Sequence, residues 1–379
     1  MNVLSIGSDK KLFEEGSEVC SRIAQYGTLV DELHIIVFAL SKTYFKKKQI
    51  AKNVWIYPTN SKNRLYYFFD AIRIGNNVLK SRNDERTRWL ITTQDPFESG
   101  LVGYILKRKH KIPLNVQEHG DFFSARHWRN ESILNFFRFY LGKFLLKKAD
   151  CIRVVAERIK KTLVKQGISE QKINVVPVRT PIDSLIMRSH SADTNSLYPE
   201  ADCVLLTMAR FVKQKNLSLL LKVFRRVVDT HPKALLLIVG DGPEKKRLLS
   251  LCNRLGLQEN VVFLSWTEDI VTYYKRADIY ILTSNYEGWG RVIIESMALN
   301  LPVIMTDVGC AREIVVHEKN GLISPIGDKA SLVRNINKCI EDKQFRMKLA
   351  KNAMNTIQEL PTEQDHLAHY RSSWEVCLK

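Results

Sequence analysis

Two carboxylates eight residues apart, Glu287 and Glu295, have a spacing suited to a polyhydroxy ligand that carries phosphate. Glu287 follows a short run at 279–284 that predicts a strand, and it stands before Gly288 and Gly290. Glu295 falls inside the helix expected next. Glycines before a helix N-terminus leave backbone N–H groups and the positive end of the helix dipole facing an anion. The stretch therefore predicts that N–H groups bind phosphate oxygens while both carboxylates accept hydrogen bonds from sugar and ribose hydroxyls.

Two cations, Arg210 and Lys215, follow another predicted strand at 203–209 and precede a predicted helix. Arginine offers a planar fork of donors and lysine a mobile point charge, and both bind phosphate. Fixed cations also neutralise the charge that develops on a leaving diphosphate. Alone, these residues are more simply surface cations, but the carboxylates in the same half of the chain favour a diphosphate site. The turn at 240–243, Gly-Asp-Gly-Pro, adds a loop at the same expected sheet edge.

Two further candidates lie in the first half of the chain. His119 follows a predicted strand at 114–117, where an imidazole could bond a sugar hydroxyl near the reacting carbon; an isolated histidine is as often structural. Gly16 and Ser17 precede a predicted helix and could form a backbone anion site. The competing interpretation is that this pair only caps the helix.

Several motifs of other chemistries are absent. The chain has no Asp-x-Asp to hold a divalent ion on a diphosphate, and no P-loop, His-Glu-x-x-His or Gly-x-Ser-x-Gly. Metal-dependent, nucleotide-hydrolysing and serine-hydrolase functions lose support, and we expect neither a metal ion nor a bound cofactor.

Strand-like and helix-like stretches alternate through all 379 residues, which is enough chain for two domains. Several predicted strands are continuous apolar runs, as in parallel strands covered on both faces, so the class is α/β with doubly wound sheets. We expect a first domain at 1–182, a linker at 183–202 and a second domain at 203–361. A closing helix at 362–379 would return to the first domain.

The composition, 45% hydrophobic and 26% charged, is that of a globular protein, and from the N-terminal residues and the short apolar runs we expect neither a signal peptide nor a spanning segment. The seven cysteines are widely spaced, and we expect them to be reduced thiols in the cytoplasm.

The net charge of +18 is concentrated in the first half. Residues 1–182 hold 32 Lys and Arg against 17 Asp and Glu, whereas residues 183–379 hold 26 against 23. A basic half indicates an anionic partner, either nucleic acid or an anionic membrane leaflet. A helix-like stretch at 131–148 mixes aromatic residues with cations and would suit a membrane interface, although a helix packed on the sheet with a solvated basic edge explains it as well.

Taken together, these residues resemble the retaining glycosyltransferases of family 4, also called glycosyl transferases group 1. The likeness is strong over about residues 200–360. It rests on the Glu-x7-Glu element from Glu287 to Glu295, on Arg210 and Lys215, and on the turn at 240–243. Two departures are Ala209, where the family usually has glycine, and the reduction of an N-terminal glycine pair to Gly16-Ser17.

The resemblance implies a GT-B fold, with two Rossmann-like domains facing across a cleft. It also implies transfer of a sugar from a UDP- or GDP-linked donor to a glycan or lipid-linked hydroxyl, with retention and without metal. Diphosphate contacts would come from Arg210 and Lys215, ribose contacts from Glu295 and donor-sugar contacts from Glu287. The remaining implied positions are His119 in the active site, Trp266 and Thr267 at the base, and Gly16, Gly288, Gly290, Arg291 and Val292 against the donor.

The setting implied is envelope or surface polysaccharide synthesis, in the cytoplasm or peripherally on the inner face of the cell membrane. One alternative is a non-catalytic nucleic-acid-binding protein, although no recognition-helix or RNA-binding aromatic signature supports it. Another is a sugar-nucleotide epimerase or phosphorylase of the same fold; an epimerase, unlike a transferase, needs no acceptor.

Overall fold

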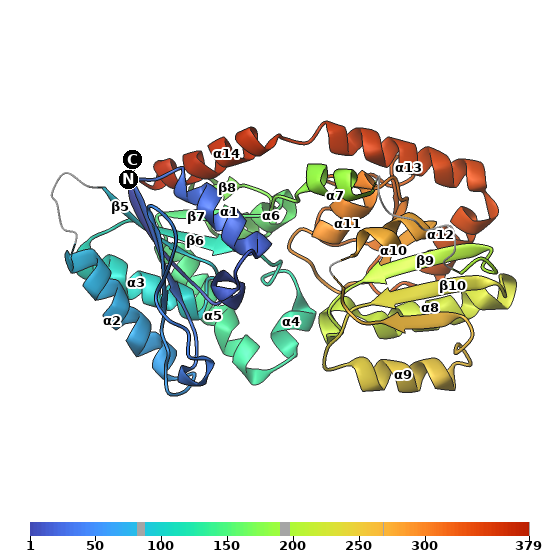
Figure 1. Cartoon of the computed structure of the whole chain (residues 1–379), viewed down its shortest axis with the longest axis horizontal. Helices are drawn as coiled ribbons and strands as arrows, with labels where there is room; N and C mark the ends of the chain where they lie inside the picture. The colour runs from blue at the N-terminus through green and yellow to red at the C-terminus, as the bar shows by residue number, and fades with distance from the viewer. Residues whose placement is uncertain (82–87, 190–197, 268, 379) are drawn as a thin grey trace. The chain divides into compact units, whose positions relative to one another are not determined.

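The structure, a computed structural model, describes residues 1–81, 88–189, 198–267 and 269–378. The chain divides into two compact units (Figure 1). Unit 1 contains Met1–Pro177 together with Pro361–Lys379, and unit 2 contains Val178–Leu360.

Unit 1 is built on an eight-stranded sheet with the order β3-β4-β2-β1-β5-β6-β7-β8. All neighbouring pairs are parallel except β3 with β4. The sequence did not predict β3, because its polar residues lack the apolar pattern of the other strands. The strands are β1 (Asn2–Gly7), β2 (Glu32–Val37), β3 (Lys48–Ala51), β4 (Val54–Pro58), β5 (Trp89–Thr93), β6 (Leu114–Glu118), β7 (Cys151–Val154) and β8 (Ile173–Val175).

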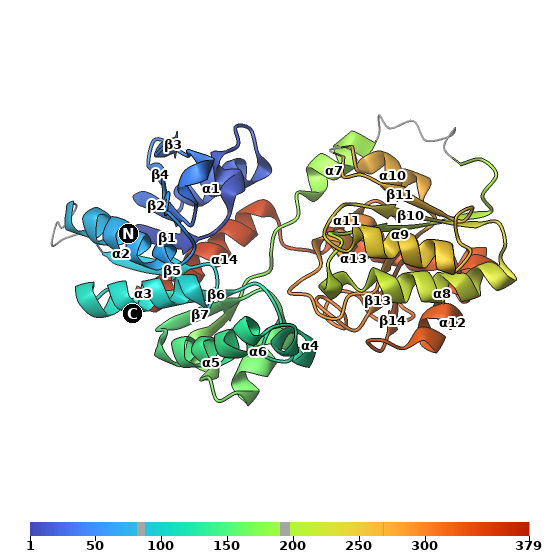
Figure 2. The same ribbon diagram turned by 90° about the horizontal axis from the view of Figure 1, so that it is seen from below.

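Helices cover both faces of this sheet, as the continuous apolar strands require. Helices α2, α3 and α5 pack side by side on one face (Figure 2), where Gly103 of α3 lies so close to the sheet that a Cβ would meet Thr93 and Leu114. Helices α1 and α14 pack on the other face through Tyr26, Tyr370 and other buried residues. The helices of unit 1 are α1 (Glu18–Gly27), α2 (Tyr66–Ser81), α3 (Glu98–His110), α4 (Arg126–Asn130), α5 (Ile133–Lys148), α6 (Glu157–Lys165) and α14 (Glu363–Glu375).

The C-terminal helix α14 is attached to unit 1 by a covalent bond as well as by packing. It starts with a capping box in which Thr362 and Asp365 bond reciprocally. Beyond its end, Cys377 forms a disulfide with Cys151 of β7. The expectation that all seven cysteines are reduced thiols is therefore wrong for this pair. Spacing could not reveal it, because the two residues are 226 positions apart and meet only when α14 packs on the sheet.

Unit 2 has a six-stranded parallel sheet with the order β11-β10-β9-β12-β13-β14. Strands β10 and β11 follow β9 on one side of it, whereas β12, β13 and β14 lie on its other side. The order thus reverses between β9 and β12, and in open α/β sheets ligands bind at such a switch point. The strands are β9 (Cys203–Met208), β10 (Ala234–Val239), β11 (Val261–Leu264), β12 (Ile279–Leu282), β13 (Val303–Thr306) and β14 (Leu322–Ser324).

The core of unit 2 lies between this sheet and helices α8, α9 and α12, where Leu220 and Phe224 of α8 and Leu332 of α12 are fully buried. Helices α7, α10, α11 and α13 belong to the same unit, and α11 packs against both α7 and α13. The helices of unit 2 are α7 (Ile182–Ser189), α8 (Leu217–Thr230), α9 (Lys245–Arg254), α10 (Val271–Arg276), α11 (Arg291–Ala298), α12 (Lys329–Glu341) and α13 (Lys343–Gln358).

The segment expected as a linker, residues 183–202, is not all connection. Its first part continues α7, which packs against α10 and α11, while residues 190–197 lie outside the described residues. A short amphipathic helix was missed because two prolines and polar neighbours masked its apolar positions. In the part of the chain that the structure describes, no helix is both long and apolar enough to cross a bilayer.

The disulfide predicts a stability that depends on redox conditions. Closing so long a loop should stabilise the fold by about 2–4 kcal/mol, chiefly by restricting the unfolded chain. We expect dithiothreitol to lower the unfolding temperature of the wild type and to leave that of Cys377→Ser unchanged. Thermal unfolding with and without reductant checks this, and a wild type indifferent to reductant would contradict the bond.

Candidate functional site

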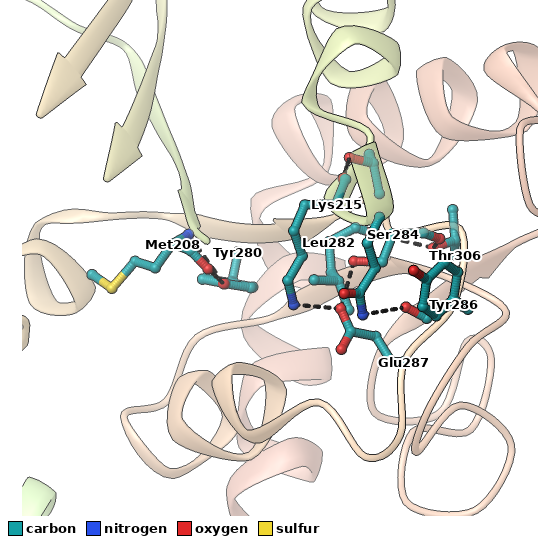
Figure 3. A network of polar contacts seen from close by, with 10 residues as sticks. Met208, Lys215, Tyr280, Leu282, Ser284, Tyr286, Glu287 and Thr306 are labelled. Atoms are coloured by element: carbon teal, nitrogen blue, oxygen red, sulfur yellow. Dashed lines mark hydrogen bonds and ion pairs between the residues drawn. The ribbon is translucent and has the colours of Figure 1, made fainter. Parts of the chain in front are cut away.

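The loops after β9 and β12 meet at the switch point of unit 2 (Figure 3). The backbone N–H of Asn285 donates to the carbonyl of Gln214 at 2.8 Å, and the Gln214 side chain donates to the carbonyl of Tyr286 at 2.9 Å. The Thr283 hydroxyl donates to the carbonyl of Lys215 at 3.2 Å. These bonds tie the cationic loop, residues 210–216, to the loop that carries the first predicted glutamate.

At the centre of this junction Lys215 and Glu287 form an ion pair, Nζ to Oε1, at 2.5 Å. The Ser284 hydroxyl donates to the same oxygen at 2.6 Å. Glu287 is only 7% exposed, so these two partners take the place of water around its carboxylate. The structure therefore brings together two residues that the sequence placed in one site from positions 72 residues apart.

Glycines allow the surrounding loops to approach this pair. Gly309 has a φ of +55°, and a Cβ there would lie 2.4 Å from the Trp289 carbonyl oxygen and 3.1 Å from Cβ of Glu287. Gly240, with a φ of +143°, packs so tightly that a Cβ would collide with the carbonyl of Ala209. The turn at 240–243 thus packs against the backbone at the start of the cationic loop.

Glu295 lies on α11 and is also buried. Its Oε2 accepts a hydrogen bond from the Tyr274 hydroxyl at 3.0 Å, and its Oε1 lies 3.5 Å from the guanidinium of Arg291. Burial, reinforced by the charge of Glu295, raises the pKa of Tyr274 well above its usual range, so the phenol remains a donor. Gly290 is the N-cap of α11, with a φ of +96°, and no side chain caps this helix.

Other described residues of unit 2 were also predicted to belong to the site, and the structure does not show them in contact with the Lys215–Glu287 pair. Arg210 is exposed and is the second residue after β9, Gly288 precedes α11, and Val292 is the second residue of α11. Trp266 follows the edge strand β11 and is 59% exposed. Thr267 beside it accepts a hydrogen bond from the N–H of Asp269 at 3.2 Å. The role of each toward the nucleotide base stays a prediction.

In unit 1, His119 follows β6, and its Nε2 lies 3.2 Å from Oε1 of Gln94 and 3.1 Å from Oε1 of Gln117. Because both partners are carbonyl oxygens, the proton belongs on Nε2 and Nδ1 is left as an acceptor. Burial, aided by the charges of Arg153 and Arg22, lowers the pKa of His119 to about 3. The imidazole is therefore neutral at physiological pH.

Gly16 lies before α1, with a φ of +71° and open space where a Cβ would be. Ser17 caps α1 by accepting a hydrogen bond from the N–H of Cys20 at 3.2 Å. The capping interpretation of this pair thus describes its local structure, and a role of Gly16 toward a donor stays a prediction.

His119 also lines a cavity of about 870 Å³ within unit 1. Sequence analysis did not find this cavity, because its walls are scattered over several segments. It also missed the residues that hold the predicted ones in place: Ser284, Tyr274, Gly309 and Gln117. Proximity in the sequence was a signal for Ser284, three residues before Glu287, and for Gln117, two residues before His119.

An acid that was not predicted from the sequence, Glu118, lies beside His119 in the chain. It is fully buried, and among the described residues the backbone N–H of Phe122 is the one neighbouring group that favours its charged form. Burial, reinforced by the nearby charge of Asp121, raises the pKa of Glu118 well above its usual range.

Comparison with known protein families identifies the chain. The model of glycosyl transferases group 1 matches residues 192–356, and that of Glycosyltransferase Family 4 matches residues 30–178. Together the two models span most of both units. The chain therefore belongs to this family of glycosyltransferases.

Curated relatives agree with the family. An uncharacterized glycosyltransferase of Methanocaldococcus jannaschii is 28% identical over 71% of this chain and 68% of its own length. The capsular polysaccharide biosynthesis glycosyltransferase CapM of Staphylococcus aureus is 25% identical over 74% of this chain and 75% of its own. Several other curated relatives are matched over only about half of their length.

A solved structure confirms the GT-B fold. The crystal structure of Anabaena HepE in complex with UDP-glucose superimposes with a TM-score of 0.75 at 21% identity, covering 99% of this chain and 98% of HepE. The predicted class, α/β with two Rossmann-like units, is correct.

The close approach at Gly309 yields a prediction. Gly309→Ala should force the loop at 287–289 to shift and should destabilise unit 2 by about 1–3 kcal/mol, from strain and lost packing. Gly327→Ala is the matched control, because Gly327 also has a positive φ, +80°, but open space around it. Equal losses in chemical unfolding for the two variants would show that the contact with Trp289 and Glu287 is unimportant.

The buried acid yields a prediction of pH dependence. A carboxyl whose pKa is higher in the folded than in the unfolded state stabilises the fold below the unfolded pKa, and this stability is lost as pH rises. The amide of Glu118→Gln does not ionise, so this variant does not lose stability as pH rises. The unfolding temperature of Glu118→Gln should therefore exceed that of the wild type at pH 8 and approach it near pH 4.5. The exposed Glu15→Gln serves as control. A Glu118→Gln variant less stable than wild type at pH 8 would contradict the assignment.

Proposed function

We propose that this protein is a retaining, metal-independent glycosyltransferase that moves a sugar from a UDP- or GDP-linked donor to a hydroxyl of a glycan or lipid-linked acceptor. The observation that carries the proposal is the junction of Lys215, Ser284 and Glu287 at the switch point of unit 2. Family membership favours sugar transfer over the nucleic-acid-binding alternative.

In this proposal the donor binds to unit 2. Its diphosphate contacts Arg210 and Lys215 and the N-terminus of α11, against the backbone of Gly290 and Arg291. Glu295, positioned by Tyr274, accepts hydrogen bonds from the ribose hydroxyls, and Glu287 binds the donor sugar. The base lies by Trp266 and Thr267. Supporting evidence from the fold is that HepE, of similar structure, is solved with UDP-glucose.

Catalysis then consists of stabilising charge and holding the reactants. Arg210 and Lys215 neutralise the leaving diphosphate, a task that fixed cations can perform without a metal ion. The released phosphate oxygen takes the proton of the acceptor hydroxyl on the same face of the sugar, which retains the configuration. His119, neutral and with Nδ1 as an acceptor, bonds a sugar hydroxyl near the reacting carbon.

We place the reaction in envelope or surface polysaccharide synthesis at the inner face of the cell membrane. CapM, a relative matched over three quarters of its length, is named for capsular polysaccharide biosynthesis. The membrane part of the proposal rests on α5 of unit 1. Its outer side exposes Ile133, Phe137, Tyr140 and Phe144, while Phe139, Leu145 and Leu146 are buried.

The donor site is tested by calorimetric titration with UDP-glucose and GDP-mannose. Arg210→Ala and Glu295→Gln should each weaken binding of the better nucleotide sugar by about 1–3 kcal/mol, the cost of unmade charged hydrogen bonds. Lys246→Ala, an exposed cation on α9, is the matched control. Binding should persist in excess EDTA; binding that requires Mg²⁺ or Mn²⁺ would refute metal independence, and unchanged affinity in both variants would refute the site.

The membrane proposal is tested by co-sedimentation with liposomes. Each cation near an anionic surface contributes about 1 kcal/mol, and salt screens the effect over a Debye length of about 8 Å. Binding should rise with anionic lipid, fall with salt, and weaken when Lys143, Lys147 and Lys148 become Glu. Glutamates at Lys246, Lys348 and Lys351 of unit 2 match the charge change and should bind like wild type. Equal losses would show that overall charge, not α5, is responsible.

A further inference from the structure

The cavity of unit 1 lies at the carboxyl edge of its sheet, where the strand order reverses between β1 and β5. Its volume of about 870 Å³ is in the range of ligand-binding cavities. Segments after β1, β2, β5 and β6 contribute to it, as do α2, α3, α4 and α5. All of these elements belong to one compact unit.

The cavity has mostly apolar walls. Phe97, Phe122 and Trp128 form one aromatic cluster, with ring centroids 4.8–5.4 Å apart. Phe38 and Tyr67 stack at 5.4 Å on another side. The remaining apolar lining residues are Leu65, Phe68, Leu101, Leu134 and Leu141. Such walls are far more apolar than the hydroxyl-rich surface of a sugar requires.

The apolar lining continues onto the surface of unit 1. Leu65 and Leu134 line the cavity and are nevertheless 80% and 54% exposed, so the cavity opens beside them. Their chain neighbours Tyr66 and Ile133 are also exposed. Exposed apolar side chains therefore stand beside the opening of the cavity, where an aliphatic chain could leave it.

Cations and hydrogen-bonding groups complete the lining. The lining contains three cations, Lys10, Arg64 and Arg138, and the acid Glu98. Glu98 forms an ion pair with Arg138 through its Oε1. The other acid is Asp95, whose carboxylate accepts a hydrogen bond from the N–H of Phe97 at 2.8 Å, so three cations stand against two acids in the lining. The balance favours an anion such as phosphate. His119 and Gln94 supply the polar groups for a hydroxylated head.

We propose that this cavity binds the acceptor and that the acceptor is an amphiphile, with a hydroxyl-bearing head joined through an anionic phosphate link to a long aliphatic chain. The inference rests on the proposed function and narrows its acceptor from a glycan or a lipid-linked molecule to a lipid-linked one with an anionic phosphate link. Hydroxyls bond His119, the phosphate meets Lys10 and Arg64, and the chain lies along the aromatic walls toward Leu65 and Leu134.

The test is calorimetric titration of the whole protein with three probes below their micelle-forming concentrations: dodecyl phosphate, butyl phosphate and dodecyl glucoside. Dodecyl phosphate should bind one to one and at least about tenfold more tightly than either other probe, because only it has both a long chain and an anion. Equal affinity for butyl phosphate would overturn the aliphatic part of the proposal. Equal affinity for dodecyl glucoside would overturn the anionic part.

Variants at exposed positions locate the site without disturbing the core. Leu65→Asp combined with Leu134→Asp should weaken dodecyl phosphate binding at least about tenfold, because it sets charges against the chain. Leu249→Asp, at an exposed leucine of α9 in unit 2, is the matched control and should bind like wild type. Equal losses, or none in the double variant, would place the amphiphile elsewhere and overturn the proposal.

Titration with UDP-glucose and GDP-mannose separates this inference from the donor site. The Leu65/Leu134 variant should bind the better nucleotide sugar as wild type does. A wild type that binds dodecyl phosphate but neither nucleotide sugar would refute the donor proposal while leaving the cavity assigned. The opposite result would leave the transferase standing and remove the lipid-linked acceptor.

Discussion

A buried carboxylate needs a partner, and in this protein the partner of Glu287 comes from a different loop. Lys215 and Ser284 both bond one oxygen of Glu287, which is almost inaccessible to water. Removing either charge would leave the other uncompensated, a situation that costs several kcal/mol in protein interiors. The pair therefore fixes the relative positions of the loops after β9 and β12, and the rest of the candidate donor site is arranged around it.

Much of this arrangement could be predicted from the sequence, because it follows from local patterns. Continuous apolar runs located nearly every strand, and parallel strands place their carboxyl ends on one edge, so Lys215 and Glu287 were expected together. Contacts between distant segments were not accessible in this way. Tyr274 behind Glu295, the disulfide of Cys151 with Cys377, and the walls of the cavity depend on packing across the chain. The polar strand β3 lacked the apolar signal altogether.

The neutral His119 of unit 1 lies between a polar network and an aromatic cavity. On one side a polar network holds it: Gln117 accepts a hydrogen bond from Arg153 at 2.7 Å and contacts Tyr370 of α14. On the other side lies the aromatic cavity that His119 lines. Helix α14 is thus connected to His119 through one residue, Gln117. The orientation of His119 therefore depends in part on the packing of α14.

The central claim, that the Lys215–Glu287 pair holds two loops together as one donor site, is tested most directly by a double-mutant cycle. Lys215→Met, Glu287→Gln and the double variant would be titrated with the nucleotide sugar that wild type binds better. If the pair acts as a unit, either single change already displaces the site, and the double variant loses no more affinity than the worse single one. Losses that add within about 0.3–0.5 kcal/mol would show two independent contacts and contradict the account.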